Sequence, residues 1–225
     1  MKIVLILCIV LFGFNQLNAQ EVIQQQQQIG YHQHDGFYLS MSVGPLLGTV
    51  TKNGLNKNST NKYSVDLSGT GVAVDLKIGC EVRENLLLHV TVISNLLQSP
   101  SVKTSIPYVL STTIKAPHSF IVGETMAGVG LTNYLMPSNI LISGTLGIGV
   151  FTFTDYNDSR NNSSTKPGIS IQLKLGKEWW ISKNWGMGVG LTYSRTTSNL
   201  RDSDGDIAAE YESRRFGILL NTTFN

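Results

Sequence analysis

The chain has 225 residues, with 17 Lys and Arg against 15 Asp and Glu, and its formal net charge is +2 at pH 7. This near balance argues against nucleic acid as a partner, because phosphate binding requires a concentrated basic face. After the N-terminus no apolar stretch approaches the roughly 20 residues of a membrane-spanning helix. Such a chain can enter a membrane only as a closed barrel.

The N-terminus has the features of a secretory signal peptide. Lys2 precedes an apolar run from Ile3 to Phe14, which is too short to span a bilayer as a helix. Leu17-Asn18-Ala19 offers residues that a signal peptidase accepts, so cleavage is expected before Gln20. We predict residues 1–19 as the signal peptide, which leaves Cys80 as the only cysteine of the mature chain and excludes an intramolecular disulfide.

Residues 20–35 form a Gln-rich segment that is predicted to be a periplasmic tail or linker. Gln24 to Gln28 is a glutamine run, and the segment lacks the apolar content needed to pack. His32, His34 and Asp35 are candidate metal ligands, but three ligands in a tail make a weak site. We interpret them as solvated polar residues and predict no metal.

From Gly36 onward the apolar residues recur with a period of two, which predicts β-strands. The alternation is clearest from Gly71 to Val82, where one face is apolar and the other carries charges and glycines. Eight segments follow this pattern: Gly36 to Gly44, Gly71 to Val82, Leu86 to Val92, Phe120 to Leu135, Asn139 to Phe153, Gly168 to Trp180, Trp185 to Thr197 and Glu210 to Phe224. Val109 to Ile114 is a weaker candidate that could extend the wall or add a hairpin.

The connections alternate strictly between long and short. The three short turns are 83–85, 136–138 and 182–184, and the four long polar loops are 51–67, 98–117, 154–167 and 198–209. Outer-membrane barrels have short periplasmic turns and longer external loops. Residues 36–225 are therefore predicted to form an all-β, eight-stranded antiparallel up-and-down transmembrane β-barrel.

Aromatic residues gather at the strand ends beside the short turns, as they do at a membrane interface. The predicted periplasmic girdle is Phe37, Tyr134, Trp179, Trp180, Trp185 and Phe224, and the outer girdle is Phe120, Phe153, Tyr193 and Tyr211. A soluble barrel of lipocalin type would also alternate, but with its apolar face inside. The loop asymmetry and the aromatic residues favour the membrane barrel.

The chain resembles the small eight-stranded outer-membrane barrels of the outer membrane protein A and X type. The resemblance rests on Gly36-Phe37-Tyr38-Leu39, Met136-Pro137-Ser138-Asn139, Gly176-Lys177-Glu178-Trp179-Trp180 and the closing alternation to Phe224. It implies residence in the outer membrane of a Gram-negative-type bacterium, with outer-membrane lipids and the barrel assembly machinery as partners. That machinery is expected to recognise a terminal aromatic residue, whereas Asn225 follows Phe224 here.

The charged face of the strands is predicted to form a network in the lumen. Its members are Asp75, Lys77, Glu81, Glu124, Lys174, Glu178 and Arg215, with His89 beside them. Both signs are present, so the charges can pair where isolated charges would be prohibitive. A proton path, an ion path or a narrow pore is the functional alternative. Arg195 is expected on the outer rim instead.

No catalytic site, cofactor or metal site is predicted. His118, Ser119 and Glu124 do not form a nucleophile–base pair, because adjacent strand residues point to opposite faces. His89 with Glu81 or Asp75 has no evident serine partner. Asp202 to Asp206 departs from the spacing of a calcium loop and is interpreted as an acidic turn.

These features favour a non-enzymatic envelope protein that contributes to membrane integrity or to surface interaction through its polar loops. A narrow pore or transporter for small or hydrophobic solutes is the alternative. A lipid A-modifying enzyme is the third hypothesis.

Overall fold

The computed structural model describes residue 34 and residues 36–55, 62–105, 111–158, 162–201 and 207–225. The predicted signal peptide, nearly all of the predicted tail, and Asp202 to Asp206 lie outside these residues. His34 to Asn225 form one compact unit, and the described part of this unit consists of strands and turns. Among the described residues, no helix is long and apolar enough to cross a membrane.

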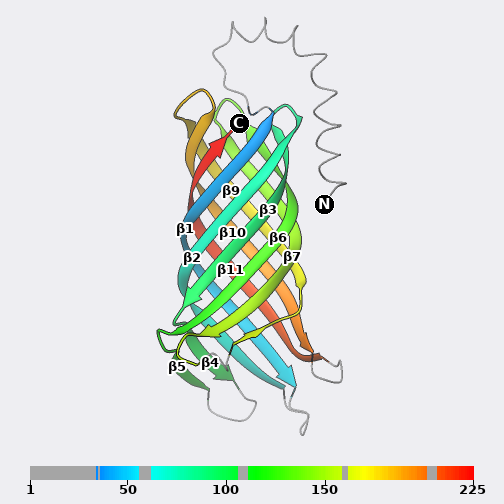
Figure 1. The fold of residues 1–225 in the computed structure, drawn as a ribbon. Coiled ribbons are helices and arrows are strands. Elements are labelled where there is room, and N and C mark those ends of the chain that lie inside the picture. The colour runs from blue at the N-terminus through cyan, green and yellow to red at the C-terminus, as the bar shows by residue number, and fades with distance from the viewer. Residues whose placement is uncertain (1–33, 35, 56–61, 106–110, 159–161, 202–206) are drawn as a thin grey trace, which may run out of the picture. The chain divides into compact units, whose positions relative to one another are not determined.

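Eight antiparallel strands close into a barrel (Figure 1). They are β1 (Phe37–Leu55), β2 (Lys62–Arg83), β3 (Leu86–Gln98), β6 (Phe120–Leu135), β7 (Ile140–Asp155), β9 (Gly168–Trp180), β10 (Trp185–Arg201) and β11 (Ile207–Phe224). Each pairs with its neighbours along the chain, and β1 pairs with both β2 and β11, which closes the wall. The predicted eight-stranded up-and-down barrel is confirmed.

Several strands run further into the long loops than predicted. Thr51 lies within the first predicted long loop, yet it still pairs with Asp66 on β2 and with Glu212 on β11. Backbone groups pair in a ladder whatever the polarity of their side chains, so the wall continues past the apolar band. The strands therefore extend into the predicted loops 51–67 and 198–209, and both connections are shorter than predicted.

The second long loop contains a hairpin of β4 (Ser101–Ser105) and β5 (Thr112–Lys115). β4 pairs with β2 at Ser64 to Ser68, and β5 pairs with β4, so this hairpin extends the wall beyond the barrel, as the weaker candidate segment suggested. A two-residue strand, β8 (Ser163–Ser164), pairs with β7. The long-loop end thus carries ordered structure of its own.

The apolar face of the strands points outward. On β2, Val72 and Ile78 are 49% and 48% exposed, whereas Asp75 and Lys77 are 1% exposed. Cys80 shares the outward parity and is partly exposed. A continuous apolar surface of this extent is unfavourable in water, and it is the surface that a membrane barrel presents to lipid. This arrangement excludes the soluble barrel with an apolar interior, and the protein is a membrane-spanning β-barrel.

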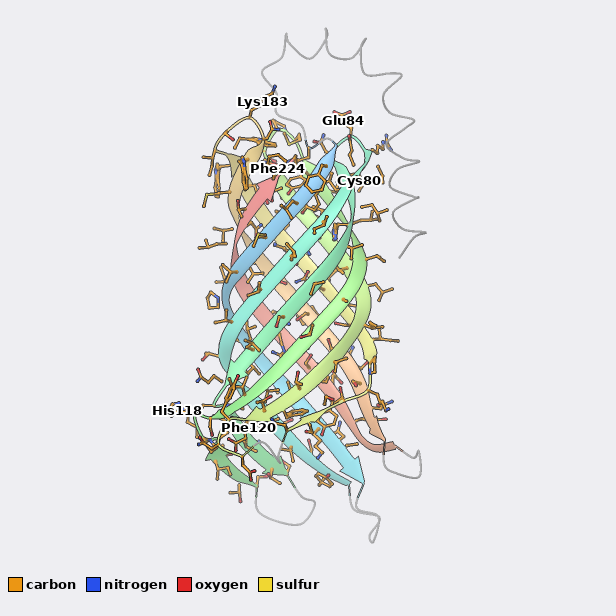
Figure 2. The ribbon with its side chains drawn as sticks, viewed as in Figure 1. Cys80, Glu84, His118, Phe120, Lys183 and Phe224 are labelled. Carbon is orange, nitrogen blue, oxygen red and sulfur yellow. The ribbon has the colours of Figure 1, made fainter. Side chains whose placement is uncertain are left out.

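The interior contains two apolar clusters and a set of buried charges. An apolar cluster beside the short turns contains Tyr38, Leu87, Tyr134 and Leu141. A larger apolar cluster towards the long loops contains Leu46, Val50, Leu67, Ala73, Leu97, Val122, Phe151, Phe153, Ala209, Tyr211 and Leu219. Asp75 and Lys77 lie on the short-turn side of Ala73 on β2, whereas Arg215 lies between Tyr211 and Leu219 of the larger cluster on β11. Figure 2 shows Cys80, Glu84, Lys183 and Phe224 at the short-turn end, with His118 and Phe120 at the opposite end.

Candidate functional site: the charged lumen

The first ion cluster in the lumen is centred on Asp75 of β2. Its Oδ2 lies 3.1 Å from Lys77 Nζ and 3.6 Å from Lys174 Nζ, and all three side chains are almost fully buried. Lys77 also donates to Gln172 Oε1 at 3.0 Å, and Lys174 donates to Ser42 Oγ at 2.6 Å. Lys174 lies on β9, which pairs with neither β1 nor β2, so its contacts cross the lumen.

The second ion cluster joins Glu124 of β6 to Arg215 of β11. Arg215 Nε lies 2.9 Å from Glu124 Oε2, and both side chains are at most 2% exposed. Thr196 donates to Glu124 Oε1 at 2.9 Å. Three strands separate β6 from β11 around the wall, so this ion pair also crosses the barrel. A buried pair of this kind fixes the two sides of the lumen relative to each other.

Glu178 is held by neutral donors. Tyr134 donates to its Oε2 at 3.1 Å, and Thr223 donates to its Oε1 at 2.8 Å. Charge-assisted hydrogen bonds of this type compensate for the loss of water around a buried carboxylate. Glu178 therefore lies in the lumen as predicted from its parity, but the two ion clusters are formed by other residues.

Glu81 does not lie with the buried charges of the lumen, and its predicted place in the lumen network is wrong. Its side chain is half-buried at the mouth beside the short turn, where Oε2 accepts a hydrogen bond from the Gly36 backbone amide at 3.3 Å. The inward parity was correct along β2, but the register shifts between Glu81 and Arg83. A position so close to the turn reaches the mouth and not the interior.

The predicted girdles are only partly placed on the outer wall. Phe37, Trp179 and Trp185 are exposed on the outside, and Phe224 contacts Phe37 and Trp185 with ring centroids 6.4 and 5.3 Å apart. Tyr134 is buried in the lumen, because it shares its strand parity with Glu124. The outer-girdle prediction is also wrong for Phe153 and Tyr211, which are buried in the larger apolar cluster.

His34 closes the short-turn mouth. It is fully buried, its ring stacks on Tyr134 with centroids 3.4 Å apart, and it lies 4.7 Å from the Trp180 ring. Its backbone amide donates to Asn85 Oδ1 at 3.2 Å, and its ring nitrogens contact Asn139 Oδ1 and Asn225 Nδ2, both at 2.7 Å. The prediction of a solvated residue is wrong for His34. We call His34, Asn85, Asn139 and Asn225 the clasp.

The clasp requires a neutral histidine. Asn139 Oδ1 can only accept, and the amide nitrogen of Asn225 can only donate, so Nε2 carries the proton and Nδ1 accepts. Burial accordingly lowers the pKa of His34 from 6.5 to about 4. Asn225, which follows Phe224, is thus part of the clasp. Its side chain contacts His34, and its backbone amide donates to Asn184 O.

One arrangement was missed because its members come from different strands. His89 Nε2 lies 3.0 Å from Thr132 Oγ1 and 3.5 Å from Ser143 Oγ, and Ser143 is 54 residues away in the chain. No spacing rule identifies such a pair. All three side chains are buried inside the filled lumen, so no substrate reaches them in this structure.

The other candidate site residues do not assemble. His118 is exposed in the loop before β6, whereas Glu124 is committed to Arg215. Among the described residues, no group of three or more His, Cys, Asp or Glu side chains could hold a metal ion. His32 and Asp35 lie outside the described residues.

No protein-family model matches the sequence, and no curated protein matches it either. Solved structures with a similar fold include Neisserial surface protein A, with 11% identity, 84% of this chain and 97% of that chain covered, and a TM-score of 0.49. The outer membrane protein OprG of Pseudomonas aeruginosa has 15% identity and a TM-score of 0.48, and the match covers 87% of this chain and 99% of that chain.

The outer membrane protease OmpT of Escherichia coli has 11% identity, covers 85% of this chain and 97% of that chain, and has a TM-score of 0.47. These three proteins are named as a surface protein, an outer membrane protein and a protease. Similarity at this level assigns none of these roles to this chain.

Proposed function

We propose that the protein is a non-conducting, non-enzymatic outer-membrane barrel that contributes to envelope integrity and presents its external loops for surface interaction. The filled lumen is the observation that carries this proposal. Two ion clusters cross the interior, and buried apolar side chains fill the space around them and towards both ends. An eight-stranded barrel is just wide enough for side chains to fill it.

The apolar clusters also argue against solute passage. Phe151, the register partner of Glu124, and Tyr211 fill the lumen around the second ion cluster, with ring centroids 6.1 Å apart. The clasp and Tyr134 occupy the opposite mouth. A hydrated solute would have to displace these side chains and break buried ion pairs. This favours a structural barrel over a narrow pore.

Planar-bilayer recording tests the non-conducting state. The wild-type protein is expected to give no conductance steps. A variant that shortens the lumenal side chains, Glu124→Ala with Arg215→Ala and Phe151→Ala, is the positive control and is expected to conduct. Regular steps from the wild-type protein at neutral pH would overturn the proposal and favour the pore.

The external loops offer a surface for interaction. In the β4–β5 hairpin every residue of β5 is exposed, and Ile114 is 62% exposed. Binding residues are commonly carried by loops on a rigid scaffold. A gene deletion is expected to increase sensitivity to detergent, and a chain lacking residues 102–114 should restore resistance while losing surface interaction.

The enzymatic alternative has its own measurement. The lipid A mass spectrum is expected to be unchanged by deletion of the gene and by His89→Ala. A change in acylation that requires His89 or Ser143 would assign catalysis to the lumen and overturn the non-enzymatic proposal.

A further inference from the structure

Two arginines face outward near the long-loop end of the wall. Arg195 on β10 and Arg214 on β11 are register partners, and their Nε atoms lie 3.1 and 2.9 Å from the same oxygen, Glu212 Oε1. Their side chains are 45% and 66% exposed. One carboxylate between two guanidinium groups leaves the cluster with a net positive charge.

The register places these arginines at the level of the lipid headgroups. Tyr193 and Phe216 are opposite each other two residues closer to the middle of the membrane, with ring centroids 4.8 Å apart. Next on the same face come Leu191 and Ile218, both exposed towards lipid. Aromatic rings mark the membrane interface, and two strand residues span about 7 Å. The guanidinium groups therefore lie just outside the acyl region.

A groove lies beside the arginines on the outside of β1, β2 and β11. Its volume is about 740 Å³, and its lining includes Leu47, Thr51, Glu212, Arg214 and Phe216. Leu47 and Phe216 are 63% and 61% exposed and form the apolar part. Thr51, Glu212 and Arg214 form the polar part, one to two pleats further from the membrane. The groove is thus apolar at one end and polar at the other, where Arg214 and Glu212 line it and Arg195 lies beside it on β10.

We propose that this surface binds one phosphorylated lipid of the outer leaflet, with its phosphate on Arg195 and Arg214 and an acyl chain over Leu47 and Phe216. The planar guanidinium group matches phosphate oxygens in a bidentate manner, which a lysine cannot reproduce. The apolar end distinguishes a lipid from a free anion. This site is independent of the lumen and of the loops that carry the proposed function.

The test compares lipids that differ only in phosphate. The full barrel is placed in phosphatidylcholine nanodiscs, and binding of bis-phosphorylated lipid A and of phosphate-free lipid A is measured by native mass spectrometry. Arg195→Gln with Arg214→Gln is expected to weaken binding of the phosphorylated lipid about tenfold, the loss typical of one charge-assisted hydrogen bond. Binding of the phosphate-free lipid should not change.

The matched control removes the same charge at the other end of the barrel. Arg83→Gln with Lys183→Gln changes two exposed cations beside the short turns and is expected to leave lipid binding unaltered. Both double variants are checked for folding by the heat-dependent gel shift of barrel proteins. An equal loss in the control would show unspecific attraction and overturn the site. Equal competition by inorganic phosphate and by the lipid would overturn the lipid assignment.

Discussion

Arg214 and Arg215 are neighbours on β11, but alternation sends them to opposite faces of the wall. Arg215 is 2% exposed and pairs with Glu124 across the lumen, whereas Arg214 is 66% exposed and shares Glu212 with Arg195. The two Nε–oxygen distances are the same, 2.9 Å. Geometry alone therefore says little about what each pair contributes.

The surroundings decide the contribution. Water solvates Arg214 when its partner is lost, so an exposed pair typically stabilises by only about 0–1 kcal/mol. Glu124 has no such replacement, and removing one member of a buried pair typically costs about 3–5 kcal/mol. An arginine on the lumenal face thus stabilises the barrel, whereas an arginine on the outer face contributes little to stability and is free to bind the proposed lipid phosphate.

Arg215→Met has the largest expected effect. It leaves the Glu124 carboxylate buried without a counter-charge, and the free energy of unfolding should fall by about 3–5 kcal/mol. Urea unfolding of the barrel in lipid vesicles, followed by tryptophan fluorescence, measures this change. Adding Glu124→Gln should recover most of the loss, and a double variant as unstable as Arg215→Met would contradict this account.

Asp75→Asn should have a smaller effect, about 3 kcal/mol, in the same measurement. It removes the carboxylate shared by Lys77 and Lys174. Gln172 Oε1 and Ser42 Oγ still accept hydrogen bonds from these lysines, which limits the loss. A loss larger than that of Arg215→Met would mean that these neutral acceptors contribute little.

Strand alternation and loop asymmetry were sufficient to predict the wall, its closure and its outward apolar face. They also placed Arg195 outside and most of the lumenal charges inside, because parity is a local property of a strand. Parity would have placed Tyr134 correctly as well, since it matches Glu124. The aromatic-girdle rule considers only the position at the strand end and not the parity, so it misplaces Tyr134.

Contacts across the lumen could not be predicted in this way. Lys174 meets Asp75, and His89 meets Ser143, only after the barrel closes with its particular stagger. The clasp was missed for a related reason. A polar residue such as His34 becomes buried only when turns from distant parts of the chain supply its partners, and composition contains no information on them.

The clasp should open on acidification, with an effect of about 2–3 kcal/mol. The pKa of His34 is about 4 when the clasp is closed and near 6.5 when it is open. The stabilisation is therefore complete above pH 6.5 and is lost as the pH falls towards 4. Hydrogen exchange at the short turns should accelerate between pH 7.5 and 4.5 after correction for intrinsic rates. His34→Asn should abolish this change, whereas His118→Asn, at an exposed loop position, should leave it intact.

Arg214→Gln should have the smallest effect on stability and so defines the other side of the comparison. Glu212 keeps Arg195 at 3.1 Å, and water reaches all three side chains, so no charge becomes isolated. In phosphate-free detergent micelles the free energy of unfolding should fall by less than about 1 kcal/mol. Raising the salt concentration should remove even this difference, because exposed charges are screened, whereas the loss in Arg215→Met should persist. A salt-resistant loss of several kcal/mol in Arg214→Gln would mean that the outer arginine is also a structural strut, and the distinction between the two faces of β11 would no longer hold.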